Sequence, residues 1–109
     1  MSNHVDLTNL HEMTDNDSEL EKQLFNEFIS SFEAGLDILR KNCDEGSSEA
    51  WRSQAHGLKG IAVNLGAKGL GDICKLAQEK HQSSLEEKNK LLNDMDTEYG
   101  LVKQFLLKQ

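Results

Sequence analysis

One histidine in this chain has neighbours that suit chemistry on phosphorus. His56 is followed by Lys59 and Gly60 at three and four positions, so on a helix both residues would be its surface neighbours. A neutral imidazole is a nucleophile near pH 7 and needs no buried base to activate it. Lys59 could balance the charge of a phosphoryl group, and Gly60 would leave the backbone bare where another protein approaches. The spacing therefore indicates a histidine that exchanges phosphoryl groups with a partner.

The helix that carries His56 is expected to bury its opposite side. Apolar residues recur at spacings of four, three, four and three, at Trp51, Ala55, Leu58, Ala62 and Leu65. On a helical wheel of roughly 100° per residue, His56 lies roughly 120° from the centre of this row. We therefore expect its ring to face solvent, with Arg52 as a general surface charge one turn before it.

The whole chain is predicted to be all-α. It contains no proline, and apolar residues recur at three and four positions rather than at two. We expect one domain, residues 1–109, folded as an antiparallel up-and-down four-helix bundle with a short additional N-terminal helix. The short helix is expected over about 6–13, and the bundle helices over about 18–43, 47–65, 68–82 and 85–107.

Start and stop signals divide these helices. The polar run 14–17 should end the first helix and cap the second, and Gly66 suits a left-handed stop. Ser84-Leu85-Glu86-Glu87 matches a capping box before the last helix.

Composition excludes several classes of function. With 109 residues there is no room for an attached ATP-binding catalytic domain, and a net charge of −7 with a pI near 5.0 disfavours nucleic acid or an anionic membrane as partner. No apolar run is long enough for a signal peptide or a membrane span, so a cytoplasmic location is expected.

Cys43 and Cys74 lack Cys-x-x-Cys spacing and suggest buried thiols in a reducing compartment. His4, His11 and His81 match no zinc spacing and are expected to be solvated.

The segment Ala55-His56-x-Leu58-Lys59-Gly60-x-Ala62-x-x-Leu65-Gly66-Ala67 resembles the signature of histidine-containing phosphotransfer (HPt) domains of two-component phosphorelays. The resemblance extends over nearly the whole chain. It implies that His56 is the phosphorylated residue, that Lys59 and Gly60 support it, and that Gln78 on the following helix hydrogen-bonds the ring. Ile61 departs from the family pattern, which usually has a small residue there.

The resemblance also implies a mechanism and a partner. His56 would take a phosphoryl group from an aspartyl phosphate on one receiver domain and pass it to an aspartate on another. The receivers, in response regulators or hybrid histidine kinases, would supply Mg²⁺ and the acidic pocket, so this chain should need no metal or nucleotide. From family architecture, an apolar docking surface is expected from Leu7, Leu10, Met13 and Phe25, with capping of the bundle core as the alternative role of these residues. The chain is expected to act as a monomer.

Two other functions stay open. The first is a helical adaptor that docks receivers without being phosphorylated, which the presence of both His56 and Lys59 disfavours. The second is the C-terminal HPt module of a hybrid sensor kinase, whereas Met1 followed at once by a helix suggests a free-standing chain.

Overall fold

Helices account for the secondary structure of this computed structural model, which describes residues 4–44 and 47–109. In chain order they are α1 (Thr8–Met13), α2 (Ser18–Asp44), α3 (Ser48–Leu65), α4 (Lys68–Glu79) and α5 (Leu85–Leu107). Neither described range contains a strand. The all-α prediction is confirmed.

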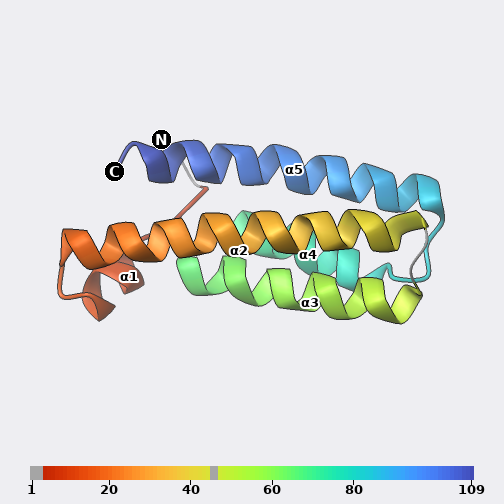
Figure 1. Cartoon of the computed structure of the whole chain (residues 1–109), viewed down its shortest axis with the longest axis horizontal. Coiled ribbons are helices and arrows are strands. Elements are labelled where there is room, and N and C mark those ends of the chain that lie inside the picture. Colours follow the sequence, from red (N-terminus) through yellow and green to blue (C-terminus); the bar gives the residue numbers. More distant parts are fainter. Residues whose placement is uncertain (1–3, 45–46) are drawn as a thin grey trace.

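The four long helices form an up-and-down bundle. Each of α2 to α5 runs antiparallel to the next, and α5 lies on the opposite side of α2 from α3 (Figure 1). α3 packs most extensively against α4, and α2 contacts both α3 and α5. The short α1 lies beside the start of α2, at the end of the bundle where α3 finishes (Figure 1). The expected bundle with an additional N-terminal helix is therefore correct.

Side-chain caps fix two of the helix starts that the sequence predicts. Asp17 Oδ1 accepts hydrogen bonds from the backbone N–H groups of Glu19 at 3.1 Å and Leu20 at 3.2 Å, before the first turn of α2. Ser84 Oγ accepts from the N–H of Glu87 at 3.2 Å, at the start of α5. These bonds satisfy N–H groups that have no partner within the helix.

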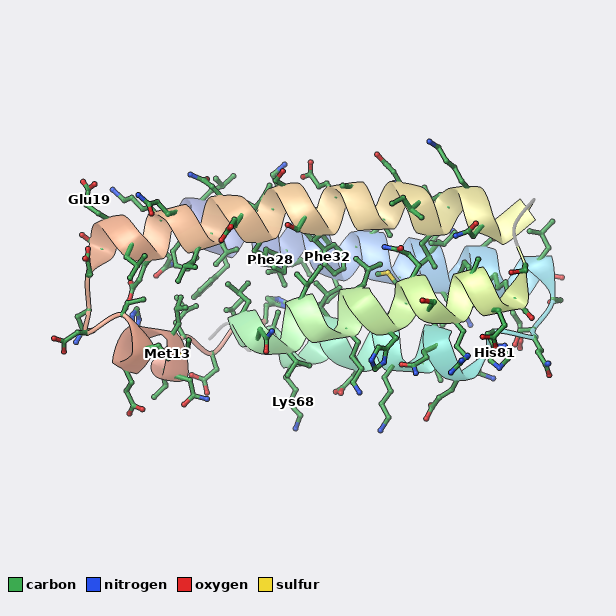
Figure 2. All side chains as sticks on the ribbon, turned by 60° about the horizontal axis from the view of Figure 1, so that its bottom comes forward. Met13, Glu19, Phe28, Phe32, Lys68 and His81 are labelled. Carbon is green, nitrogen blue, oxygen red and sulfur yellow. The ribbon has the colours of Figure 1, made fainter. Side chains whose placement is uncertain are left out.

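The apolar faces of the helices meet in one core. Figure 2 shows Phe28 and Phe32 pointing from α2 into the bundle, where Phe32 stacks on Tyr99 of α5 with ring centroids 4.9 Å apart. Burial of a large apolar side chain stabilises the fold by roughly 1.5–3 kcal/mol. The largest fully buried side chains are Trp51, Phe32, Leu39, Leu58, Leu70, Met95, Val102 and Cys74.

α4 is shorter than predicted, because it ends at Glu79 and not near residue 82. The last carbonyl groups of a helix have no partner within it and must find one elsewhere. Here the carbonyl of Ala77 accepts a hydrogen bond from Trp51 Nε1 at 2.8 Å. The carbonyl of Lys80 accepts from the N–H of Ser83 at 2.9 Å, in the turn that leads to α5. The partner of Ala77 comes from another helix, so periodicity could not reveal this end.

α1 also differs from its predicted range, since it begins at Thr8 and not at residue 6. Asp6 stays outside the helix and accepts hydrogen bonds from the N–H of Thr8 at 3.0 Å and its hydroxyl at 2.6 Å. These bonds lower the pKa of the Asp6 carboxyl group. The backbone N–H of Asp6 donates to the carbonyl of Gly66 at 2.9 Å, which ties the start of the described chain to the end of α3.

Replacing Gly66 by alanine is expected to destabilise the bundle. Gly66 has a φ of +101°, and a Cβ there would collide with the carbonyl oxygen of Asp6. We expect Gly66→Ala to lower the free energy of unfolding by about 1–3 kcal/mol, measured by urea denaturation. Gly100→Ala is the matched control, because a Cβ at this helix-interior glycine meets nothing within 4 Å. It should raise stability by roughly 0.5–1 kcal/mol, and an equal loss in both variants would contradict the strain argument.

Candidate functional site

His56 projects from the outer face of α3. Its side chain is exposed, whereas Ala55 and Leu58, beside it in the sequence, are fully buried. Every member of the predicted apolar row is at most 6% exposed: Trp51, Ala55, Leu58, Ala62 and Leu65. The row anchors α3 in the bundle and so fixes the direction in which the imidazole points.

α4 supplies a partner for the imidazole ring. His56 Nδ1 lies 3.3 Å from Oε1 of Gln78, which is half-buried on the neighbouring helix. An amide oxygen can only accept a hydrogen bond, so this contact requires the ring proton on Nδ1. The lone pair of the neutral ring is then on Nε2. The arrangement thus leaves a nucleophilic nitrogen with no proton on it.

Lys59 and Gly60 lie one turn further along α3. Lys59 is half-buried and Gly60 is exposed. A Cβ built at Gly60, or at Gly57 beside His56, meets nothing within 4 Å. Neither glycine is therefore needed for packing against a neighbouring helix of the described chain. The surface next to the ring is open backbone.

Arg52, one turn before His56, is engaged elsewhere. Its guanidinium donates two hydrogen bonds of 3.0 Å to the two carboxylate oxygens of Glu49 on the same helix. The pair raises the pKa of Arg52 and lowers that of Glu49. Arg52 thus forms a surface ion pair with Glu49, in line with its expected role as a general surface charge.

A groove of about 520 Å³ opens beside the histidine helix, between α1, α2 and α3. From α3 it is lined by Ile61, Asn64 and Leu65. Its walls are mostly apolar and carry one carboxylate, from Glu27. The groove is lined by Leu10, Met13, Leu24, Glu27, Phe28, Ser31, Ile61, Asn64 and Leu65.

The expected docking residues fall into two groups. Leu7 and Phe25 are at most 7% exposed, belong to the core and do not line the groove. Leu10 is also 6% exposed, although it borders the groove, and only Met13 is open to solvent, at 76% exposed. Three of the four residues therefore belong to the core, and only Met13 offers exposed apolar surface. Of the two roles that the sequence left open, capping the core is the one that fits Leu7, Leu10 and Phe25. Sequence periodicity shows which face of α1 is apolar but not which helix covers it.

His4 and His11 were expected to be solvated, and the structure corrects both expectations. His4 Nδ1 lies 2.7 Å from Glu98 Oε2, and His11 Nδ1 lies 2.7 Å from Glu21 Oε2. The same Glu21 oxygen accepts a hydrogen bond from the hydroxyl of Thr14 at 2.6 Å. Thr14 and then His11 lower the pKa of Glu21. These contacts join α1 to the start of α2 and the N-terminal segment to α5, which local sequence patterns do not encode.

His81 is likewise not simply solvated. It is half-buried at the far end of α4 (Figure 2), and its Nδ1 is buried with no hydrogen-bond partner in the described part of the chain. Within residues 4–44 and 47–109, no three histidine, cysteine or acidic side chains gather as a metal site would require. No described helix is both long enough and apolar enough to cross a membrane.

Neither cysteine forms a disulfide. Cys74 is fully buried on α4, and burial raises the pKa of its thiol to about 12. Cys43 is half-buried at the end of α2, with its Sγ 3.6 Å from Asn89 Oδ1. Neither therefore offers a reactive thiolate beside His56.

Comparisons with known proteins identify the family of the chain. A family model described as the Hpt domain matches residues 23–105, a range that includes His56, Lys59, Gly60 and Gln78. Among solved structures, the chain resembles histidine-containing phosphotransfer protein B (HptB) from Pseudomonas aeruginosa PAO1, with 26% identity and a TM-score of 0.87. That match covers 99% of this chain and 95% of the other. A search of curated proteins found no match. Because the family model spans most of the chain, including the helix pair that holds the histidine, the protein belongs to the Hpt domain family.

Proposed function

We propose that this Hpt protein is a phosphorelay intermediate that carries the phosphoryl group on His56. The observation that carries the proposal is the contact between His56 Nδ1 and Gln78 Oε1, at 3.3 Å on an exposed helix face. It leaves Nε2 free to attack. The phosphoryl group would come from an aspartyl phosphate of one receiver domain and leave to an aspartate of another.

In the transfer step, His56 is the only group of this chain that forms or breaks a covalent bond. The Nε2 lone pair attacks phosphorus, the N–P bond forms, and the bond between phosphorus and the aspartyl oxygen breaks. The aspartate carboxylate leaves with the electron pair. The ring then has a positive charge, and the Nδ1 proton stays in its hydrogen bond to Gln78. Return of the phosphoryl group to a second aspartate is the same step in reverse.

Lys59 and Gly60 support the step in different ways. The ammonium of Lys59, one turn from His56, would balance the charge on the phosphoryl oxygens during transfer and in the adduct. Gly60 would let the receiver's active site approach the ring, since no side chain stands there. In this proposal Mg²⁺ and the acidic pocket belong to the receiver.

The groove between α1, α2 and α3 is a fitting place for the apolar contact with the receiver. It borders the later part of α3, the helix that carries His56, and is lined by Met13, Phe28 and Ile61 among others. A monomer acting in the cytoplasm is part of the same proposal, and two cysteines that form no disulfide support a reducing location. The adaptor alternative gains no support from the geometry, because an adaptor would not need an oriented imidazole.

Replacing His56 by glutamine should abolish phosphorylation. The test incubates the protein with a phosphorylated receiver and follows the transfer of label. Wild type should form an acid-labile, base-stable adduct, and His56→Gln should form none while its circular dichroism stays unchanged. His4→Gln is the control, because the imidazole of His4 pairs with Glu98 and is not part of the candidate site. Label that persists in His56→Gln would rule out His56 as the acceptor and reopen the adaptor function.

Replacing Gly60 by glutamine should separate transfer from stability. Glutamine favours a helix interior over glycine by roughly 0.5 kcal/mol, and a Cβ at Gly60 is unhindered within the chain. We expect unchanged or slightly higher stability but transfer slowed by roughly 10²-fold, the scale of a misplaced partner. Gly100→Gln on α5, also unhindered, should gain similar stability and transfer normally. Normal transfer by Gly60→Gln would mean that the receiver does not approach over this glycine.

Replacing Gln78 should test its role in orienting the ring. Gln78→Ala removes the acceptor for the Nδ1 proton, whereas Gln78→Glu keeps an acceptor oxygen at that position. A hydrogen bond of this kind contributes about 0.5–1.5 kcal/mol, so transfer by Gln78→Ala should slow by roughly 2- to 12-fold. Gln78→Glu should transfer close to the wild-type rate in single-turnover measurements. Equal rates for wild type and Gln78→Ala would contradict the orienting role.

A further inference from the structure

The packing of α4 on α3 places a second lysine near His56. Two contacts fix the register of these antiparallel helices. Gln78 meets His56, and Gly71, two turns earlier on α4, lies under Val63. A Cβ on Gly71 would come within 2.9 Å of Val63 Cγ2. Lys75 is between Gly71 and Gln78 in the sequence, so it lies alongside the stretch of α3 between Val63 and His56.

That stretch of α3 contains Lys59. The backbone carbonyl of Lys59 is 3.9 Å from a Cβ built at Gly71, which confirms that the two helices are close at this level. Lys75 is exposed and Lys59 is half-buried. Two helices therefore bring one ammonium each to the surface beside the imidazole.

Neither lysine is held in an ion pair, although Asp72 and Glu79 are three and four positions from Lys75 on the same helix. No ion pair or hydrogen bond of Lys59 or Lys75 is found among the described residues, whereas Arg52 is held by Glu49 and Lys103 by Glu33. The positive charge beside His56 is thus available to a partner.

The acidic residues of α4 lie further around the helix. At roughly 100° per residue, Lys75 falls about 60° from Gln78, whereas Glu79 and Asp72 fall about 100° and 120° from it. Among the charged residues of α4, Lys75 is therefore the one nearest to α3. Lys68, at about 80°, lies on the same face of α4 as Lys75 but two turns earlier, so it is further along the helix from Gln78 and His56.

This local charge opposes that of the whole molecule. The chain has a net charge of −7, which repels an acidic partner at long range. Ions screen exposed charges beyond about 8 Å at physiological ionic strength, so the groups nearest the contact decide how the partner is held. A receiver presents the carboxylates of its acidic pocket to the histidine, and two unpaired ammonium groups beside the ring complement them.

We propose that Lys75 is a positioning residue that, together with Lys59, holds the acidic pocket of the receiver over His56. This inference rests on the proposed function. It assigns to α4 a direct contact with the partner, in addition to the hydrogen bond that Gln78 accepts from His56.

The test compares phosphotransfer by Lys75→Gln and by Lys90→Gln, using a phosphorylated receiver. Both substitutions remove one exposed positive charge, but Lys90 is on α5. At low ionic strength we expect Lys75→Gln to lower kcat/KM by roughly 3- to 10-fold and Lys90→Gln to leave it unchanged. The loss in kcat/KM should nearly disappear near 1 M salt. Lys75→Arg, which keeps the positive charge, should have the wild-type kcat/KM. The half-life of the adduct without receiver should be the same in all variants.

Two results would overturn the inference. One is the same kcat/KM for Lys75→Gln and Lys90→Gln, and the other is a loss in Lys75→Gln that high salt does not reduce. In both cases a wild-type protein that takes label normally leaves the proposed function standing. If wild type takes no label, the proposed function fails first and the role of Lys75 fails with it.

Discussion

The hydrogen bond from the buried Trp51 indole to the carbonyl of Ala77 sets the register on which the site depends. A buried bond of this kind contributes only about 0.5–1.5 kcal/mol net, but leaving the Ala77 carbonyl unpaired would cost more. Gln78 follows Ala77 directly, and His56 is just over one turn beyond Trp51. A slip of α4 by one turn would therefore break the buried bond and separate the amide from the imidazole. The same register of α4 on α3 is thus needed for the buried hydrogen bond of the fold and for the contact in the candidate site.

Features encoded within a single helix could be predicted from the sequence. The apolar row of α3 placed His56 on the outside, and the capping residues Asp17 and Ser84 marked helix starts, because both signals involve neighbours within a few residues. The contact between His56 and Gln78 spans 22 residues, and only the resemblance to a family indicated it. Contacts between helices explain what was missed. Near the early end of α4, the carbonyl of Ala77 accepts a hydrogen bond from the Trp51 indole. No periodic pattern shows that a residue so distant in the sequence will donate to that carbonyl.

The placement of α1 is the clearest case of structure that local patterns do not contain. Leu10 and Met13 are both apolar, yet the first is buried and the second is exposed, because α1 is held to α2 in one orientation. Glu21 supplies much of that attachment, since its carboxylate meets both His11 and Thr14. The groove beside the histidine helix follows from this attachment. Its shape thus depends on polar contacts at the bundle end, although its lining is mostly apolar.

The glycines of the bundle helices fall into two groups, those that allow close helix packing and those that face open space. A Cβ at Gly35 would crowd Leu58, and one at Gly71 would crowd Val63, so these two glycines allow helices to approach closely. Gly57 and Gly60 have open space instead, although each costs a helix interior roughly 0.5–1 kcal/mol relative to alanine. Close packing against a neighbouring helix would be a structural reason for these two glycines, and the open space at both positions removes it. Open space alone does not imply function, because Gly100 on α5 has it too. What distinguishes Gly57 and Gly60 is that they lie one and four positions after an exposed imidazole whose Nδ1 is held by Gln78.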